Sequence, residues 1–478
     1  MLAPLLLIGV AAPVIAQRLG SPASSLPAAP QGGPPVRVLL GHGSAWELGA
    51  QPLRMRLLDG QGRPLRTLAM GERLTLSGSP AGVKIEVQSA EGGRLSLNPQ
   101  RDGLWLVPLA EKDQQPFLAF GRERYRGQLQ IRAGEAGQLL AINQLPLEAY
   151  LASVVGSEMP ASWPQAALQA QAVAARTYAL SQLRPAAAYD LKATVASQAY
   201  RGLAGETEST RAAVASTRGQ VLMAQGRLIQ AVFHSSSGGR TEDSGQVWSR
   251  QLPYLVSVPG NDRDAPVNRW NLRIEPDRLR ALFRETGGLR SIDILESSSS
   301  GRVKLARVIG PTGTLELSGT ELRQRLGLRS TLVTFALQAV PPGSTGGVID
   351  RTVRGSVPPS AAGWPQRLPP LIAPPFLGSD PSEAPLLDSA SGASPDATAP
   401  GASRVTAAAP ATRPLFAAGT AMTALEPGYA LLIEGRGFGH GVGMSQWGAY
   451  AMAREGRNYE QIRRHYYLGV ELLLYPSP

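Results

Sequence analysis

Cysteine is absent from this chain of 478 residues. Its absence excludes disulfide bonds, thiolate metal sites and a cysteine nucleophile. The compartment stays open, because a chain that can build a substantial core does not need disulfides to fold. Histidine is also scarce, and no His-x-x-x-His spacing occurs among its four copies, His42, His234, His440 and His465. We therefore expect neither a metal site nor a cofactor.

Charged residues make up only 17% of the sequence, against 43% apolar residues. Such a composition allows a real core and argues against global disorder. The length fits two or three domains, or one elaborate domain with an insertion. Strand and helix signals both occur, and they predict an α+β fold. We expect a β-rich N-terminal part and a mixed core with a long alanine-rich helix, interrupted by a disordered proline-rich insertion.

Lysine is scarce, so the net charge of +11 comes almost wholly from arginine. The planar guanidinium group binds carboxylates and phosphates, which favours an anionic polymer as the partner. Nucleic acid is the rival partner, but the basic residues are spread along the chain. Because no recognition helix, zinc finger or RNA-binding aromatic signature occurs, we expect no nucleic acid. A solvated basic surface is the simplest alternative.

The N-terminal residues 1–16 form an uncharged run that ends in Val14-Ile15-Ala16. Small residues at that end are typical of signal cleavage, so we interpret 1–16 as a signal peptide and expect export to the periplasm or cell wall. One alternative is an uncleaved anchor, which would be the only membrane contact. The other is a buried core helix. A bilayer span needs roughly twenty apolar residues, more than this run provides. Residues 17–35, rich in Pro, Ala, Ser and Gly, indicate a flexible tether.

Residues 36–114 predict a β-rich region. Short alternating runs, such as those at 36–40 and 83–87, occur together with turn signals at Asp59-Gly60, Gly92-Gly93 and Asp102-Gly103. A mixed core follows at 115–340 and resumes at 415–478. Between its two parts, residues 341–414 hold fifteen of the forty prolines and predict a disordered insertion.

The core contains several helix signals. Ser162-Trp-Pro-Gln165 predicts a capping box that opens a long alanine-rich helix extending to Leu183. The remaining patterns predict strands at 129–132, 221–233 and 254–258, a helix at 276–286, strands within 292–317, a helix capped by Ser318 and Glu321, a strand from about 430, a helix from Met444, a helix capped by Asn458 and Gln461, and a strand at 470–475.

Three motifs carry the most specific information. The first is Tyr150-Leu-Ala-Ser-Val-Val-Gly-Ser-Glu-Met-Pro160, which leads into the second, Ala170-Gln-Ala-Val-Ala-Ala-Arg-Thr-Tyr178. The third is the late block Gly439-His-Gly-Val-Gly-Met-Ser-Gln446. In this combination the chain resembles the SpoIID/LytB family of sporulation and cell-wall proteins, over residues 115–335 and 430–478.

The resemblance implies lytic transglycosylase activity on peptidoglycan in one branch of the family and stimulation of a cell-wall amidase in the other. It also implies that Glu158 is the catalytic glutamate. Cleaving a glycosidic bond needs an acid that protonates the leaving oxygen, and hydrolysis normally needs a second carboxylate. If the 6-hydroxyl of the sugar attacks instead of water, Glu158 alone can serve as acid and then as base.

Glu158 precedes the expected helix start, where the positive end of the helix dipole would favour the ionised carboxylate. We therefore expect the apolar neighbours Met159 and Trp163 to raise its pKa by burial. The alternative is that Glu158 only neutralises the helix start. On the helix itself, Arg176 is a candidate for binding a lactyl or peptide carboxylate, or else a structural ion pair. Tyr178 is a weaker candidate, since a core role is more usual.

The segment Phe233-His-Ser-Ser-Ser-Gly-Gly-Arg-Thr-Glu242 follows a predicted strand. His234, Ser235 and Ser236 are candidates for sugar contacts. A Ser-His-Asp triad with Asp243 is disfavoured, because neighbouring residues of a strand face opposite ways. Trp248 and Tyr254 are candidates for a stacking surface that contacts sugar rings. Packing in the core is the alternative for both.

Every second residue is glycine in Gly435-Arg-Gly-Phe-Gly-His-Gly-Val-Gly443. One face of this segment then lacks side chains, which would let a glycan approach the backbone; close packing of two backbones is the alternative. We expect His440, Gln446 and Trp447 to line the cleft. If the site is shared, Glu158 must lie beside the segments that contain His234 and His440.

These observations favour a lytic transglycosylase that binds peptidoglycan glycan strands and leaves anhydro-sugar ends. The main alternative is a non-catalytic glycan-binding protein that activates an N-acetylmuramoyl-L-alanine amidase, which would then be its protein partner. A structural wall-anchoring protein, with the proline-rich insertion as a spacer, is a third possibility.

Overall fold

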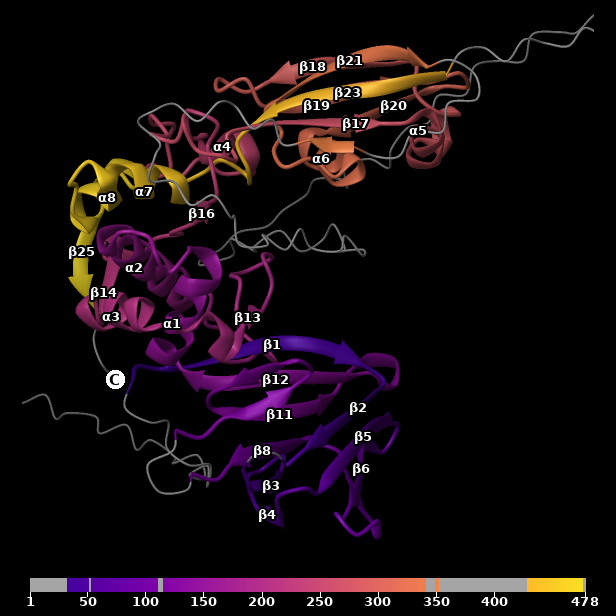
Figure 1. Ribbon diagram of the computed structural model, residues 1–478, viewed down its shortest axis with the longest axis vertical. Coiled ribbons are helices and arrows are strands. Elements are labelled where there is room, and N and C mark those ends of the chain that lie inside the picture. Colours follow the sequence, from indigo (N-terminus) through magenta and orange to yellow (C-terminus); the bar gives the residue numbers. More distant parts are fainter. Residues whose placement is uncertain (1–31, 51–52, 111–114, 341–348, 352–427, 476–478) are drawn as a thin grey trace, which may run out of the picture. The chain divides into compact units, whose positions relative to one another are not determined.

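A computed structural model describes residues 32–50, 53–110, 115–340, 349–351 and 428–475 (Figure 1). The fold is α+β, as expected. The chain forms two compact units. The first contains Gly41–Ala119 and Gly127–Ile142, and the second contains Gln31–Leu40, Phe120–Arg126 and the chain from Asn143 onward. The expected signal peptide, nearly all of the tether and most of the insertion lie outside the described residues.

The first unit consists of antiparallel sheets. One has the order β2-β5-β6-β7, and β11, β8, β3 and β4 are neighbours in the other. In β6 the apolar residues Val83, Ile85 and Val87 are buried while Lys84 and Glu86 are exposed, which confirms the alternating pattern. The strands are β2 (Ala45–Gly49), β3 (Met55–Asp59), β4 (Pro64–Leu68), β5 (Arg73–Ser79), β6 (Gly82–Gln88), β7 (Arg94–Gln100), β8 (Leu104–Pro108) and β11 (Gln128–Ala133).

Strands near the boundaries of the two units complete the N-terminal half. The predicted strand at 36–40 lies within β1 (Pro35–Gly43), which pairs in parallel with β13 (Leu191–Lys192) through Val38 and Leu39. The other strands of this part are β9 (Leu118–Phe120), β10 (Glu123–Tyr125) and β12 (Leu139–Pro146).

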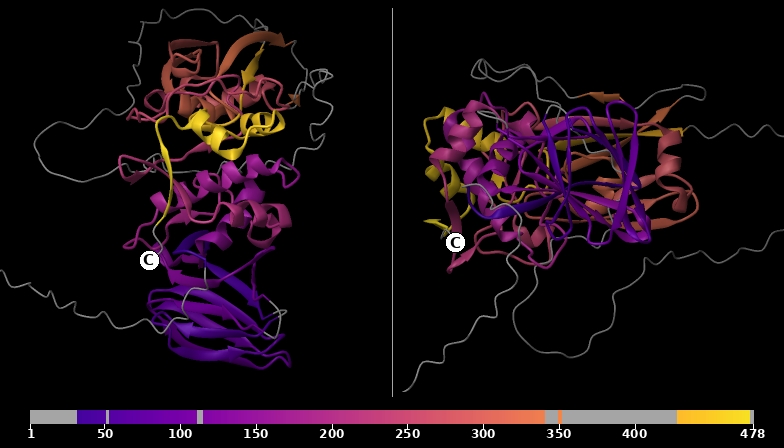
Figure 2. Two further views of the ribbon diagram at one scale, coloured as in Figure 1. Left: turned by 90° about the vertical axis from the view of Figure 1, so that its left-hand side faces the viewer. Right: turned by 90° about the horizontal axis from the view of Figure 1, so that it is seen from below.

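The long helix α2 (Gln165–Ser181) lies at the centre of the helical part of the second unit. It packs against α1 (Leu147–Glu158), α3 (Glu208–Ser216), α7 (Gln446–Arg454) and α8 (Tyr459–Tyr466). Figure 2 shows the yellow helices α7 and α8 beside the magenta helices. Seven alanines occur in α2, and small side chains let neighbouring helices approach it from several sides. The helix is therefore buried almost all round rather than on one face.

The predicted start of α2 is wrong. Ser162 lies in a turn, closed by a hydrogen bond from the Trp163 N–H to the Pro160 carbonyl, and Pro164 is the N-cap without any side-chain cap. A proline disfavours helical geometry in the residue before it, which explains why α2 begins after Pro164 and not at Ser162. Sequence reasoning also missed α1, whose last residue is Glu158.

The predicted strand 221–233 is a hairpin followed by a separate short strand. β14 (Gln220–Ala224) and β15 (Arg227–Leu228) are joined by Gln225 and Gly226, both at positive φ (51° and 73°). Positive φ at both turn residues matches the twist of a two-residue hairpin. β16 (Phe233–His234) follows. Residues 254–258 form no strand, because the Leu255 carbonyl and the Ser257 N–H bond to the Ser244 N–H and the Asp243 side chain instead.

The remaining part of the second unit is a β-rich lobe with two sheets, ordered β21-β23-β17-β22 and β18-β19-β20. The helix signals here were right, since Ser318 and Glu321 form a capping box. The elements are β17 (Arg269–Ile274), α5 (Pro276–Leu282), β18 (Ser291–Ser297), β19 (Val303–Ile309), β20 (Thr314–Ser318), α6 (Gly319–Leu326), β21 (Val333–Val340), β22 (Ile349–Arg351) and β23 (Gly428–Arg436).

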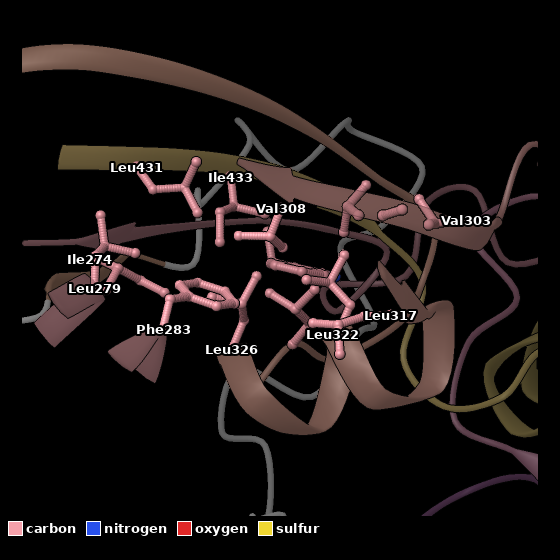
Figure 3. Close-up of a cluster of buried hydrophobic side chains, with 14 residues drawn as sticks. Ile274, Leu279, Phe283, Val303, Val308, Leu317, Leu322, Leu326, Leu431 and Ile433 are labelled. Atoms are coloured by element: carbon pink, nitrogen blue, oxygen red, sulfur yellow. The ribbon is translucent and has the colours of Figure 1, made fainter. Parts of the chain in front are cut away.

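A cluster of buried apolar side chains holds this lobe together (Figure 3). Phe283, which is fully buried, and Leu326 from α6 lie among side chains of both sheets, including Val308 and Ile433. Strands β21 and β23 are paired over their whole length, ending at Val340 and Gly428. Val340 and Gly428 therefore lie side by side although they are far apart in the sequence, and β22, which comes from the expected insertion, pairs with β17 in the same sheet.

The C-terminal elements match the predictions closely. α8 begins at the predicted capping box of Asn458 and Gln461, and β25 (Glu471–Leu474) pairs with β14. The helix expected from Met444 begins two residues later, because Met444 and Ser445 form the short strand β24. None of the helices in the described part of the chain combines the length and apolar character that a membrane span requires.

Replacing Phe283 by alanine should lower the free energy of unfolding of the lobe by about 3–5 kcal/mol, because the change leaves a cavity in a fully buried cluster. Leu337→Ala is the control, since 38% of the Leu337 side chain is exposed. Urea denaturation of both variants measures the difference. Equal midpoints for the two would show that the cluster does not stabilise the lobe.

Candidate active site

Glu158 is held by two hydrogen bonds from distant parts of the sequence. The Ala199 N–H donates to Glu158 Oε1 (2.7 Å), and the Gln446 amide donates from Nε2 to Glu158 Oε2 (3.0 Å). Glu158 as a whole residue is partly exposed. A carboxyl group held in a fixed orientation is what proton transfer to a bound sugar requires.

Burial raises the pKa of Glu158, although the hydrogen bonds from Ala199 and Gln446 act in the opposite direction. The expected position before a helix N-terminus was wrong, because Glu158 is the last residue of α1. The negative end of a helix dipole disfavours a carboxylate there, so the dipole acts in the same direction as burial. The conflict between dipole and burial therefore does not arise.

An aromatic cluster lies next to this carboxyl group along the chain. Trp163 packs against Trp447 (ring centroids 4.7 Å apart) and Tyr450 (4.8 Å), and Met159 is buried. Trp447 was expected to line a cleft, but only 3% of it is exposed. Its ring packs against Trp163 and Tyr450, so we assign it to packing and not to ligand contact.

The three segments that were expected to share a site do come together. β16 pairs in parallel with β24, which aligns His234 with Ser445, and the Trp447 N–H donates to the Ser235 carbonyl (3.0 Å). In the sequence Gln446 lies between Ser445 and Trp447, and its side-chain amide donates to Glu158. The segments that contain His234, His440 and Glu158 are therefore parts of one hydrogen-bonded arrangement.

His234 and His440 lie next to each other, with ring centroids 5.5 Å apart. Burial, with the nearby Arg302 charge, lowers the pKa of His234 to about 3. Burial and the neighbouring His234 lower the pKa of His440 well below its usual range. Both rings are therefore neutral near pH 7. His234 is 4% exposed, with Nδ1 3.0 Å from the Val442 carbonyl, so it does not face a ligand as expected; His440 is partly exposed.

The buried carboxylate of Asp262 organises the serine-rich loop. It accepts hydrogen bonds from Ser236 Oγ (3.0 Å), Ser237 Oγ (2.9 Å), the Gly239 N–H (3.0 Å) and Ser445 Oγ (2.7 Å). Ser236 is 1% exposed, so its predicted sugar contact is wrong. The disfavoured triad is also absent, because Ser236 bonds to Asp262 and not to His234.

Arg176 is a structural residue. It is fully buried and forms a two-pronged ion pair with Glu148, with both nitrogen–oxygen distances 2.8 Å. It also donates to the carbonyls of Gln220 (3.2 Å) and Val214 (3.3 Å). The predicted binding of a substrate carboxylate is therefore wrong, and the ion-pair alternative describes the residue.

The remaining candidates differ in accessibility. Tyr178 is partly exposed, and burial raises its pKa although a hydrogen bond to Ser197 opposes the shift. The Tyr254 hydroxyl accepts from the Gln230 N–H (3.2 Å). Trp248 is partly exposed, with its ring 5.4 Å from that of His440. Ser235 is also partly exposed. Ligand contact by Trp248 and Ser235 therefore stays a prediction.

Sequence reasoning missed three residues that shape the site. Ala199 acts through its backbone N–H, which no side-chain pattern reveals. Asp262 lies outside every motif. Glu148 lies two residues before Tyr150, where the first motif begins. This position and its acidic side chain were the only signals that Glu148 could pair with Arg176.

The fold and site define an α+β protein built around one hydrogen-bonded glutamate beside a glycine-rich segment. Residues 135–223 match the SpoIID family, described as stage II sporulation protein. This match agrees with the resemblance of the sequence motifs to the SpoIID/LytB family.

Three relatives illustrate the similarity. An amidase enhancer of Bacillus subtilis (strain 168) is 29% identical over 345 residues, or 68% of this chain and 40% of that protein. An uncharacterized protein of Brachyspira hyodysenteriae is 25% identical, over 80% of this chain and 81% of that protein. The stage II sporulation protein D of Bacillus subtilis is 25% identical, over 70% of this chain and 76% of that protein. The chain thus spans less than half of the amidase enhancer.

Replacing Gln446 by methionine should raise the pKa of Glu158 further, because the amide N–H stabilises the ionised carboxylate. The titration of ¹³C-labelled glutamate carboxyl groups measures the shift, with Glu158→Gln identifying the resonance. Gln169→Met is the matched control, because Gln169 donates to Ser216 (2.9 Å) instead. An unchanged or lower pKa would contradict the assigned contact.

Replacing Glu148 by glutamine should lower the free energy of unfolding by about 3–5 kcal/mol, since it leaves the buried Arg176 charge without its partner. Glu316→Gln is the control, because it breaks a more exposed ion pair with Arg307 that contributes at most about 1 kcal/mol. Thermal and urea unfolding measure both. Similar stability of the two variants would show that the Glu148–Arg176 pair is not structural.

Proposed function

We propose that this protein is a lytic transglycosylase that cleaves the glycan strands of peptidoglycan, with Glu158 as its catalytic residue. The observation that carries the proposal is the state of Glu158: burial raises its pKa, two neutral N–H groups orient it, and the residue as a whole is partly exposed. A carboxyl group with a raised pKa can donate a proton at pH values where an ordinary glutamate is ionised.

Among the described residues, Glu158 has no second carboxylate that acts on it. No other acidic side chain of the described residues perturbs its pKa, and both of its hydrogen-bond donors are amides. Hydrolytic glycosidases normally use two carboxyl groups, one of which activates water or attacks the sugar. A single carboxyl group favours attack by a hydroxyl group of the substrate itself.

The reaction then proceeds in two proton transfers. Glu158 protonates the glycosidic oxygen while the bond between that oxygen and C1 of the muramic sugar breaks. The 6-hydroxyl oxygen of the same sugar forms a new bond to C1, and its proton passes to the Glu158 carboxylate. The products are a free hydroxyl end and a 1,6-anhydro end, and no water is consumed. Glu158 ends the cycle protonated, as it began.

The similarity to a stage II sporulation protein D and to an amidase enhancer supports a role in cell-wall metabolism. Because this substrate lies outside the cytoplasm, we extend the proposal to export, in agreement with the predicted signal peptide at 1–16. The similarity to the amidase enhancer favours a second candidate function: a glycan-binding protein that activates a cell-wall amidase without cleaving the strand itself.

Replacing Glu158 by glutamine should reduce strand cleavage by roughly a hundred- to ten-thousand-fold, because the amide cannot donate the proton. Mass spectrometry of purified glycan strands incubated with each protein detects the anhydro ends. Glu455→Gln is the control, since Glu455 is exposed at the end of α7.

Strand binding by both variants should match that of the wild type. If the wild type binds strands but produces no anhydro ends from peptide-bearing or peptide-free substrates, the enzyme assignment is wrong. A rise in amidase activity when the same protein is added would then support the activator function.

A further inference from the structure

Two arginines border the segment from Phe438 to His440. The carbonyl of Arg329 accepts a hydrogen bond from the Gly439 N–H (2.9 Å), and the Arg329 guanidinium lies 5.9 Å from the centre of the Phe438 ring. Arg323, on α6, donates from Nε to the carbonyl of Leu328 (3.1 Å), the residue before Arg329. The loop after α6 thus brings the Arg323 side chain next to the glycine-rich segment.

Arg323 lacks an acidic partner among the described residues. Among the described residues, the bond to the Leu328 carbonyl is the one hydrogen bond of its side chain, and the residue is partly buried. Other arginines nearby are neutralised: Arg325 on the same helix pairs with Glu285 (2.9 Å), and Arg302 lies 3.7 Å from Glu242. Withdrawing a charge from water without a counterion is unfavourable. The Arg323 charge also contributes to lowering the pKa of His440, after burial and the neighbouring His234.

The same place offers flat side chains. The ring of Trp248 lies 5.4 Å from that of His440, and Trp248, His440 and Phe438 are each partly exposed. Aromatic faces provide apolar contact area for the flat, carbon-bearing side of a sugar ring. A guanidinium group beside them would bind a carboxylate with two parallel hydrogen bonds.

We propose that Arg323, together with Trp248 and His440, forms a subsite for a carboxylate-bearing sugar of the bound strand. The proposal rests on the proposed glycan-binding function. The carboxylate can come from two sources: the lactyl group of a muramic sugar that has lost its stem peptide, or the stem peptide itself. The role for which Arg176 was one candidate is thus proposed for an arginine that has no acidic partner among the described residues.

Binding is measured in a Glu158→Gln background, so that no strand is cleaved. The probes are three tetrasaccharides: a neutral N-acetylglucosamine oligomer, a muramic-acid-containing strand without peptides, and the same strand with peptides. We expect a carboxylate-bearing strand to bind about ten-fold more tightly than the neutral oligomer, the size of one charge-assisted hydrogen-bonded contact. Replacing Arg323 by glutamine should abolish this ten-fold difference and leave binding of the neutral oligomer unchanged.

Two further variants serve as controls. Arg323→Lys keeps the charge and should retain part of the preference, although it loses the planar fork. Arg278→Gln removes one positive charge from an exposed position on α5 and should retain all of the preference. Thermal unfolding of each variant checks that the fold is kept.

The probes also identify the source of the carboxylate. An Arg323 effect on the peptide-free strand assigns the contact to the lactyl group, and an effect on the peptide-bearing strand alone assigns it to the peptide. If the Glu158→Gln protein with Arg323 intact binds neutral and carboxylate-bearing probes equally, or binds none, the proposal is overturned without reference to any Arg323 variant. Equal weakening of all probes by Arg323→Gln overturns it as well. Neither result alters the test of Glu158, which measures cleavage.

Discussion

The hydrogen bond between the Gln446 amide and the Glu158 carboxyl group is the contact on which the site depends. It joins the end of α1 to the beginning of α7, which are separated by most of the chain. Gln446 can reach Glu158 only because α7 starts where it does. That start is fixed by Ser445, whose hydroxyl caps α7 at the Gly448 N–H and donates to Asp262. Through Ser445, the buried Asp262 carboxylate thus fixes the position of the Gln446 amide, and this amide orients the carboxyl group of Glu158.

The two carboxyl groups show how surroundings separate similar side chains. Asp262 is fully buried and accepts hydrogen bonds from hydroxyl and N–H groups on several sides, so its binding capacity is used within the protein. Glu158 receives one bond at each oxygen and remains partly exposed. The first arrangement builds structure, whereas the second leaves a proton donor that can meet a ligand.

Local signals in the sequence predicted the elements that local interactions determine. The capping boxes at Ser318 and Asn458 were right, because each involves side chains only three residues apart. The start of α2 was wrong because Pro164 restricts the residue before it, a constraint that outweighs a capping pattern. The hairpin at Gln225 was missed because a non-glycine residue there adopts positive φ.

The site was predictable only where a motif marked it. Glu158 belongs to the first motif and Gln446 to the third, and their hydrogen bond shows that the two motifs lie next to each other in the fold. Ala199 could not be found, since its contribution is a backbone N–H. The role of Arg176 depends on Glu148, and that of Ser236 depends on Asp262; both partners were identified only from the folded chain. Sequence patterns identify residues that are capable of chemistry. The fold determines which of them already use their polar groups in contacts within the protein.

The central claim is that Glu158 protonates the glycosidic oxygen of a bound strand. A crystal structure of the Glu158→Gln protein with a muramic-acid-containing tetrasaccharide tests it most directly. We predict that a glycosidic oxygen lies within about 3.2 Å of the side chain at position 158. The 6-hydroxyl of the muramic sugar should point toward C1 of the same sugar. A strand bound with every glycosidic oxygen well beyond hydrogen-bonding distance of that side chain would contradict the account.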